Sequence, residues 1–185
     1  MPAHGTRGDG SNGAVVWLTG LPGSGKSTLA FAVEAALRAS GRQTVVLDGD
    51  VLRLGLCADL GFSVADRVEH IRRVGEVARL FMQQGIVVLV ALVSPIRAAR
   101  DSVKAKLPEG AFLEVYCSSS LEVCRARDPK GMYAKAAQGL IANFTGVSAG
   151  YEAPLAPALT LETGHESVAV SVGRLLACVR AALAP

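Results

Sequence analysis

The chain has 185 residues, of which 50% are hydrophobic and 19% are charged, so its length and composition suit one domain with a real core and exclude a disordered chain. A formal net charge of +3 is too small to indicate binding to nucleic acid or to a membrane surface. Aromatic residues, at 5%, are also too few to form stacking platforms among the basic residues, so we expect neither partner.

The ends of the chain and its cysteines bear on where the protein works. Residues 1–13 are polar and glycine-rich without the apolar core of a signal peptide, which predicts a disordered arm ahead of one domain over 14–185. The longest apolar run, 86–93, is too short to span a bilayer. The cysteines lack C-x-x-C and zinc spacing, which predicts reduced thiols in a cytoplasmic protein; they are Cys57, Cys117, Cys124 and Cys178.

The most specific motif lies between a predicted strand over 15–19 and a predicted helix over 29–37. It matches the pattern G-x-x-x-x-G-K-[ST] at every fixed position, as Gly20, Leu21, Pro22, Gly23, Ser24, Gly25, Lys26, Ser27 and Thr28. Glycines let backbone N–H groups point at phosphate oxygens, Lys26 adds a cation for the outer phosphates, and the Ser27 hydroxyl suits Mg²⁺. The order of strand, loop and helix favours a phosphate-binding loop over a glycine-rich turn that binds nothing.

A second predicted strand, over 43–47, runs into two carboxylates, Asp48 and Asp50. Ligands bind at the carboxyl ends of strands in open α/β sheets, so the pair is placed to hold Mg²⁺ or to take a proton from an attacking hydroxyl. The alternative is an Asp-Gly turn with solvated side chains.

A long helix is predicted over 66–84, with apolar residues at helical spacing on its core face. Ser63 and Asp66, three residues apart, resemble a capping box at its start. Arg67 and His70 lie three residues apart near its start, on one side.

The uninterrupted apolar run over 86–93 is typical of a central parallel strand that is covered on both faces. It ends at Ser94, and spacing alone predicts that this serine caps a helix over 98–106. A strand over 112–117 and a short helix over 120–127 follow.

The helix and strand pattern breaks over about 128–152, where basic, aromatic and glycine residues mix without a clear core face. Such a segment predicts a lid that closes over substrate and excludes water; the alternative is an ordinary surface excursion. A strand over 158–161 and a helix over 166–183 complete an α/β fold: a mostly parallel five-stranded sheet, helices on both faces and a small lid. The ligand crevice is expected where Gly20, Asp50 and Ser94 converge.

The motifs together resemble those of adenylylsulfate kinases. The resemblance runs from about residue 13 to the end and rests on the stretches 20–28, 47–50, 59–63, 66–67, 94–95, 127–131 and 144–146. It implies a P-loop kinase of sulfate assimilation that transfers the γ-phosphoryl of ATP to the 3′-hydroxyl of adenosine 5′-phosphosulfate (APS), giving 3′-phosphoadenosine 5′-phosphosulfate (PAPS) and ADP. It also implies a homodimer, with a sulfate adenylyltransferase as a candidate partner.

The resemblance implies roles on the ATP side and in catalysis. Residues 20–28 and Arg127 would bind ATP, with Arg127 at the base, and Ser27 and Asp50 would hold Mg²⁺. The catalytic residues would be Lys26, Asp50 and Ser94. Descriptions of the family label this serine a phosphoserine intermediate, but an in-line transfer needs positioning and charge neutralisation, which favours a hydrogen bond to substrate.

The resemblance also implies an acceptor site. Arg53, Arg67 and Lys130 would bind the phosphosulfate side, and Phe62 and Phe144 would sandwich the adenine. The acceptor would be bound in all by Asp50, Arg53, Phe62, Arg67, His70, Ser94, Lys130 and Phe144.

Three positions on the acceptor side depart from the asparagines that are common in the family: Val51, Cys57 and His70. His70 can substitute for an amide, and the ATP half is untouched. The departures leave open a related kinase that acts on another small-molecule hydroxyl. A different class of function, a non-catalytic nucleotide-binding regulatory module, is disfavoured because Lys26, Ser27 and Asp50 are intact.

Overall fold

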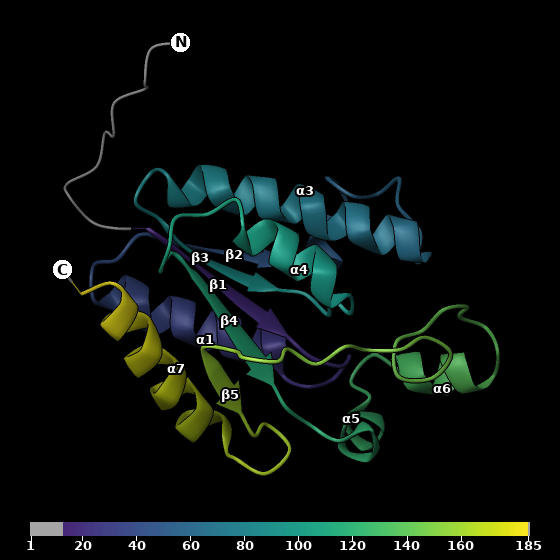
Figure 1. Cartoon of the computed structure of the whole chain (residues 1–185). Coiled ribbons are helices and arrows are strands. Elements are labelled where there is room, and N and C mark those ends of the chain that lie inside the picture. Colours follow the sequence, from purple (N-terminus) through teal and green to yellow (C-terminus); the bar gives the residue numbers. More distant parts are fainter. Residues whose placement is uncertain (1–12, 185) are drawn as a thin grey trace.

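The central strand β1 (Ala14–Thr19) has strand neighbours on both sides, and Figure 1 shows it in the middle of the sheet. All strand pairs are parallel, in the order β2-β3-β1-β4-β5. The other strands are β2 (Thr44–Asp48), β3 (Val87–Ala91), β4 (Phe112–Cys117) and β5 (Leu159–Leu161). This computed structural model describes residues 13–184, so the predicted arm lies outside the described residues except for Gly13. The predicted five-stranded α/β sheet is confirmed.

Helices cover both faces of the sheet, as Figure 1 shows. Successive side chains of β1 point to opposite faces and so pack under both helical layers. Val16 and Leu18 join the core under α1 (Lys26–Ala39) and α7 (Val168–Ala182). Val15 and Trp17 join the core under α3 (Val64–Met82) and α4 (Arg97–Lys104). Burial on both faces explains why these strands read as unbroken apolar runs. None of the helices within residues 13–184 is long and apolar enough to cross a membrane.

The start of α3 confirms the predicted capping box. The Ser63 hydroxyl accepts a hydrogen bond from the Asp66 backbone N–H, and the Asp66 carboxylate accepts one from the Ser63 backbone N–H. Farther along, α3 packs closely on α4: a Cβ on Gly75 would lie 2.6 Å from a methyl group of Val103. Only glycine fits this crossing without moving the helices.

The segment over 128–152 has more structure than its sequence predicts. It contains a short helix, α6 (Met132–Ala137), and follows α5 (Leu121–Arg127). Tyr133 and Phe144 pack edge to face with ring centroids 5.0 Å apart, inside a small buried cluster with Cys124 and Ala136. The expectation that this segment lacks a core face is therefore wrong. A six-residue helix gives too short a periodic signal, and its apolar side chains pack on one another rather than on the sheet.

Two further predictions at strand ends need correction. The turn after β2 is a one-turn helix, α2 (Gly49–Leu52), which the Asp48 side chain caps. Ser94 does not cap α4, because that helix begins at Arg97 and its N-cap residue, Ile96, makes no side-chain cap. The Ser94 hydroxyl is instead hydrogen-bonded inside the protein, a long-range contact that spacing cannot reveal.

Candidate active site

A cavity of about 790 Å³ opens at the carboxyl end of the sheet. Its walls come from the phosphate loop, the ends of β2 and β3, the first turns of α3 and the segment 128–145. The strand order places this cavity beside β1 and β3, where successive connections leave in opposite directions, which is the usual ligand site of open α/β sheets. Of the three residues predicted to converge on the ligand crevice, Asp50 and Ser94 line the cavity and Gly20 does not.

The phosphate loop lies directly before α1, so the positive end of that helix faces the cavity. Gly23 and Gly25 have φ angles of 78° and 92°, a left-handed backbone that glycine adopts without strain. The loop lines the cavity from Pro22 to Thr28, whereas Gly20 and Leu21 do not line it. These first two predicted binding residues serve the loop through their carbonyl oxygens.

Lys26 is folded back onto its own loop. Its Nζ donates hydrogen bonds to the carbonyl oxygens of Gly20 and Leu21 at 2.9 and 2.8 Å. Burial lowers the pKa of Lys26 to about 8, while the nearby carboxylates of Asp48 and Asp50 oppose that effect. The amine therefore remains mostly protonated near pH 7 and can turn toward a bound polyphosphate.

Ser27 and Asp48 provide the oxygen atoms that are best placed to hold Mg²⁺. The Ser27 hydroxyl donates a 2.6 Å hydrogen bond to one Asp48 carboxylate oxygen, and the other oxygen accepts from the Asp50 backbone N–H at 2.9 Å. Oxygen donors of this kind suit Mg²⁺, which keeps few protein ligands and takes the rest from waters and phosphates. Residues 13–184 contain no cluster of three or more acidic, histidine or cysteine side chains that could hold a metal ion.

The carboxylate pair predicted from the sequence includes Asp48, whereas the metal ligands implied by the family resemblance were Ser27 and Asp50 only. The signal for Asp48 was its place as the last residue of the apolar strand, where a side chain meets the phosphate loop. Asp50 is exposed instead, and its carboxylate forms an ion pair with Lys130, which lies across the cavity. A second contact also joins the α3 side of the cavity to the segment 128–152: Arg67 donates to the carbonyl oxygen of Asn143 at 2.5 Å.

Two arginines gather at the acceptor end predicted from the sequence. The guanidinium carbons of Arg53 and Arg67 lie 4.3 and 5.6 Å from the ring centroid of Phe62. In the described part of the chain neither guanidinium forms an ion pair with a carboxylate, and both line the cavity. An anionic group is the natural partner for this pair.

The two predicted adenine-binding rings line the same cavity but differ in burial. Phe62 is 45% exposed, whereas Phe144 is 8% exposed and packs on Tyr133. Their positions allow the predicted sandwich, which stays a prediction.

Only one of the three unusual acceptor-side residues reaches the cavity. Cys57 is buried and Val51 exposed, and neither lines it, while His70 does. His70 is 6% exposed and its Nε2 has no hydrogen-bond partner among the described residues. Burial, with the nearby charges of Arg53 and Arg67, lowers the pKa of His70 to about 4. His70 is therefore a neutral imidazole in the cavity lining whose Nε2 is a buried polar atom without a partner among the described residues.

Ser94 is 3% exposed and has a φ of 39°, unusual for a residue other than glycine. Its hydroxyl accepts from Trp17 Nε1 at 3.0 Å and donates to Thr19 Oγ1 at 3.0 Å. One lone pair is left for a ligand.

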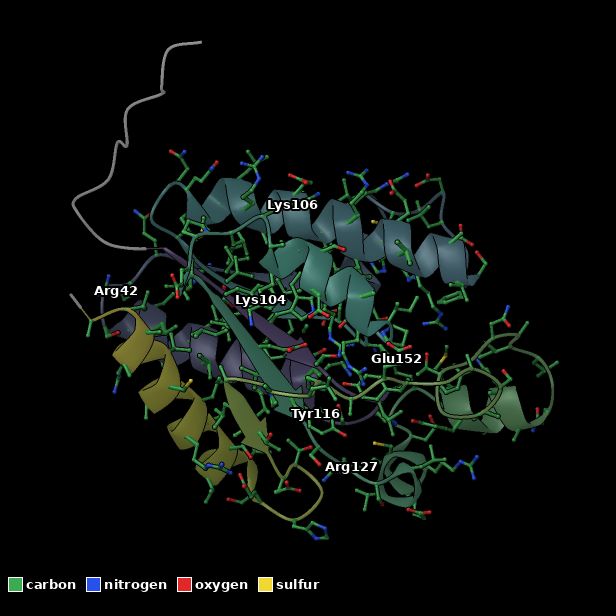
Figure 2. All side chains as sticks on the ribbon, viewed as in Figure 1. Arg42, Lys104, Lys106, Tyr116, Arg127 and Glu152 are labelled. Atoms are coloured by element: carbon green, nitrogen blue, oxygen red, sulfur yellow. The ribbon has the colours of Figure 1, made fainter. Side chains whose placement is uncertain are left out.

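Arg127, the residue predicted at the ATP base, lies on the side of β5. It donates to the Thr163 carbonyl oxygen at 2.6 Å, and Figure 2 shows it near α5 below the end of β4.

Comparison with known proteins identifies the family. The sequence model described as Adenylylsulphate kinase matches residues 12–162. The chain belongs to the adenylylsulphate kinase family. This family member is 56% identical over 167 residues to the adenylyl-sulfate kinase of Shewanella oneidensis, covering 90% of this chain and 82% of that protein. It is 54% identical over 168 residues to that of Acaryochloris marina, with 91% and 82% covered.

A solved structure agrees with this kinase along nearly its whole length. The Mycobacterium tuberculosis APS kinase CysC in complex with AMPPNP and APS superposes with a TM-score of 0.86 and 43% identity. The match covers 92% of this chain and 99% of that one. The predicted family and the predicted P-loop kinase fold are thus both confirmed.

Proposed function

We propose that this ATP-dependent kinase transfers the γ-phosphoryl of ATP to the 3′-hydroxyl of APS, giving PAPS and ADP. One observation carries the proposal: the complete phosphate loop and the arginines Arg53 and Arg67 open into the same cavity. Two anionic substrates can therefore meet there with their charges compensated. The ATP analogue and APS bound by the Mycobacterium tuberculosis relative are the substrates expected for this chain.

On the ATP side, the loop amides and Lys26 would neutralise charge that develops on the transferred phosphoryl group. Ser27, Asp48 and Asp50 would hold Mg²⁺, which supplies further charge compensation between the outer phosphates when bound. Arg127 would contact the base.

On the acceptor side, Arg53, Arg67 and Lys130 would bind the phosphosulfate, with the adenine between Phe62 and Phe144. Asp50 would orient the 3′-hydroxyl and accept its proton as the O–P bond forms. Holding both substrates in line supplies much of the rate enhancement in such a transfer.

The segment 128–152 would act as a lid of the single domain over 14–185. Its contacts already reach both halves of the site: Lys130 pairs with Asp50, and the Tyr133 hydroxyl donates to the Pro22 carbonyl oxygen at 2.9 Å. Closure would keep water from competing with the acceptor for the phosphoryl group.

Ser94→Ala should retain phosphoryl transfer within about tenfold of the wild type, because the substrate loses only one hydrogen bond. The Ser94 hydroxyl is buried and already bonded to Trp17 and Thr19, which does not suit a nucleophile. Steady-state rates and a search for labelled phosphate on the protein, with Ser102→Ala as the exposed control, check this. An inactive but folded Ser94→Ala, together with acid-stable phosphate on wild-type Ser94, would establish a covalent intermediate instead.

His70→Ala should raise KM for APS about tenfold and leave KM for ATP unchanged, because it removes a hydrogen-bonding group from the acceptor side only. The effect should be the same at about pH 6 and pH 8, since a pKa of about 4 keeps the imidazole neutral at both. His165→Ala, an exposed site outside the cavity, is the control. His70→Asn should restore binding; equal changes in both KM values would show that His70 does not contact the acceptor.

Release of ADP with APS, adenosine, AMP and simple alcohols as acceptors tests the proposed function. Release that depends on APS supports it. Turnover only with another hydroxyl would identify a kinase with a different acceptor, and the absence of turnover with every acceptor would favour the regulatory module.

We also propose a cytoplasmic homodimer that receives APS from a sulfate adenylyltransferase, on the strength of the family resemblance. Sedimentation of the purified protein tests the dimer.

A further inference from the structure

Arg100, on α4, is a completely buried charge outside the cavity lining. Its guanidinium reaches three different groups. Nε donates to the Glu114 carboxylate at 2.6 Å, Nη1 to the Ser94 carbonyl oxygen at 2.6 Å, and Nη2 to the Glu152 carbonyl oxygen at 2.9 Å. Burial of an arginine is unfavourable unless it is paired in this way, and the planar fork fixes the relative positions of its partners.

The partner Ser94, with the turn that it forms after β3, is part of the cavity wall. Its left-handed backbone is an uncommon conformation that persists only where the surroundings hold it. Arg100 holds its carbonyl oxygen, while Trp17 and Thr19 hold its hydroxyl. The shape of this part of the wall therefore depends on Arg100.

The third partner, Glu152, is the last residue of the proposed lid. Figure 2 shows Glu152 beside the N-terminal end of α4, where its carboxylate accepts from the Arg97 backbone N–H at 2.7 Å. Its own N–H donates to the Pro95 carbonyl oxygen at 2.9 Å. The preceding residue, Tyr151, is hydrogen-bonded through its hydroxyl to Thr19, one residue before the phosphate loop, at 3.0 Å.

One buried network thus joins three segments: the C-terminal end of the lid at residues 151–152, the turn at Ser94 and the start of the phosphate loop after Thr19. We propose that Arg100 is a positioning residue that fixes the returning end of the lid against the Ser94 turn, so that closure excludes water from the γ-phosphate. The proposal rests on the proposed kinase activity. It predicts that loosening this anchor lets ATP be hydrolysed without transfer.

Arg100→Lys is the informative variant, because it keeps a positive charge for Glu114 but cannot reach all three groups at once. We expect the ratio of acceptor-independent ATP hydrolysis to phosphoryl transfer to rise about tenfold and KM for APS to rise, with KM for ATP unchanged. Arg72→Lys, an exposed arginine paired with Glu69, is the matched control. The double variant Arg100→Met with Glu114→Leu removes both buried charges and should show the same loss of coupling without an unpaired carboxylate.

Fluorescence gives a readout that does not depend on turnover. Trp17 is the only tryptophan of the chain and its indole N–H contacts the Ser94 hydroxyl, so the emission change on adding APS reports on this turn. Arg100→Lys should reduce or shift that change. Lower thermal stability with unaltered coupling, KM and emission would overturn the proposal and leave Arg100 a structural residue only. If the wild-type protein neither bound nor phosphorylated APS, the kinase proposal would be refuted. The rates of ATP hydrolysis without acceptor could then still be compared between the wild type and Arg100→Lys to test the role of Arg100.

Discussion

Replacing Lys26 by methionine is expected to lower kcat about 10²–10³-fold, the usual effect of removing one preorganised positive group from a transition state. In the structure Lys26 Nζ lies within its loop, bonded to two backbone carbonyl oxygens, and has to turn toward the phosphates to act. Methionine keeps the length and volume of the side chain but removes the charge, so the loss falls on the rate rather than on the shape of the loop.

Thermal unfolding separates this loss from misfolding. Because burial lowers the pKa of Lys26, the native state disfavours its charge, and the unfolding temperature of Lys26→Met should equal or exceed that of the wild type. Lys104→Met, at an exposed position on α4 labelled in Figure 2, is the control with unchanged kinetics. A Lys26→Met enzyme with wild-type kcat would show that this loop does not hold the reacting phosphates.

Replacing Asp50 by asparagine is expected to lower kcat about 10²–10⁴-fold, the range for loss of a general base. The asparagine still accepts a hydrogen bond from Lys130 but neither accepts the proton of the acceptor hydroxyl nor supplies a negative charge for Mg²⁺. KM for ATP should change little, since the loop is untouched. Initial rates at saturating ATP and APS measure the effect.

Two variants control for other causes. Asp101→Asn, exposed on α4, should have wild-type kinetics. Lys130→Met breaks the ion pair with Asp50 from the other side, so it reports how much of the Asp50 effect comes from the lid contact. If Lys130→Met reproduced the whole loss while Asp50→Asn remained active, Asp50 would serve only to hold the lid.

The parts of the fold that the sequence predicts are those with local causes. The phosphate loop, the capping box at Ser63 and the buried strands depend on neighbouring residues, and each is found where it was expected. The sequence predicts Asp48 and Asp50 as a pair but not that Asp48 meets Ser27, because that contact joins residues that are 21 positions apart. Spacing within one stretch identifies a pair of carboxylates but not which of them meets the loop.

Long-range contacts also explain the wrong assignment of Ser94 and the burial of Arg100, for which the sequence predicts no role. Ser94 reads as a helix cap beside a proline, yet its partners Trp17 and Thr19 belong to the central strand. Arg100 lies among small and charged residues in a sequence typical of an exposed helix, and it is buried among partners distant in sequence, Glu114 on β4 and Glu152. The tertiary arrangement creates both environments, so no local pattern announces them.

The most direct test of the proposed reaction is to identify its product. Purified protein is incubated with ATP, Mg²⁺ and APS, and the nucleotide product is separated and examined by phosphorus NMR. The expected result is PAPS, with the new phosphate on the 3′-oxygen and one ADP formed for each PAPS. ADP without a phosphorylated acceptor, or phosphate on any other oxygen, would contradict the proposed reaction.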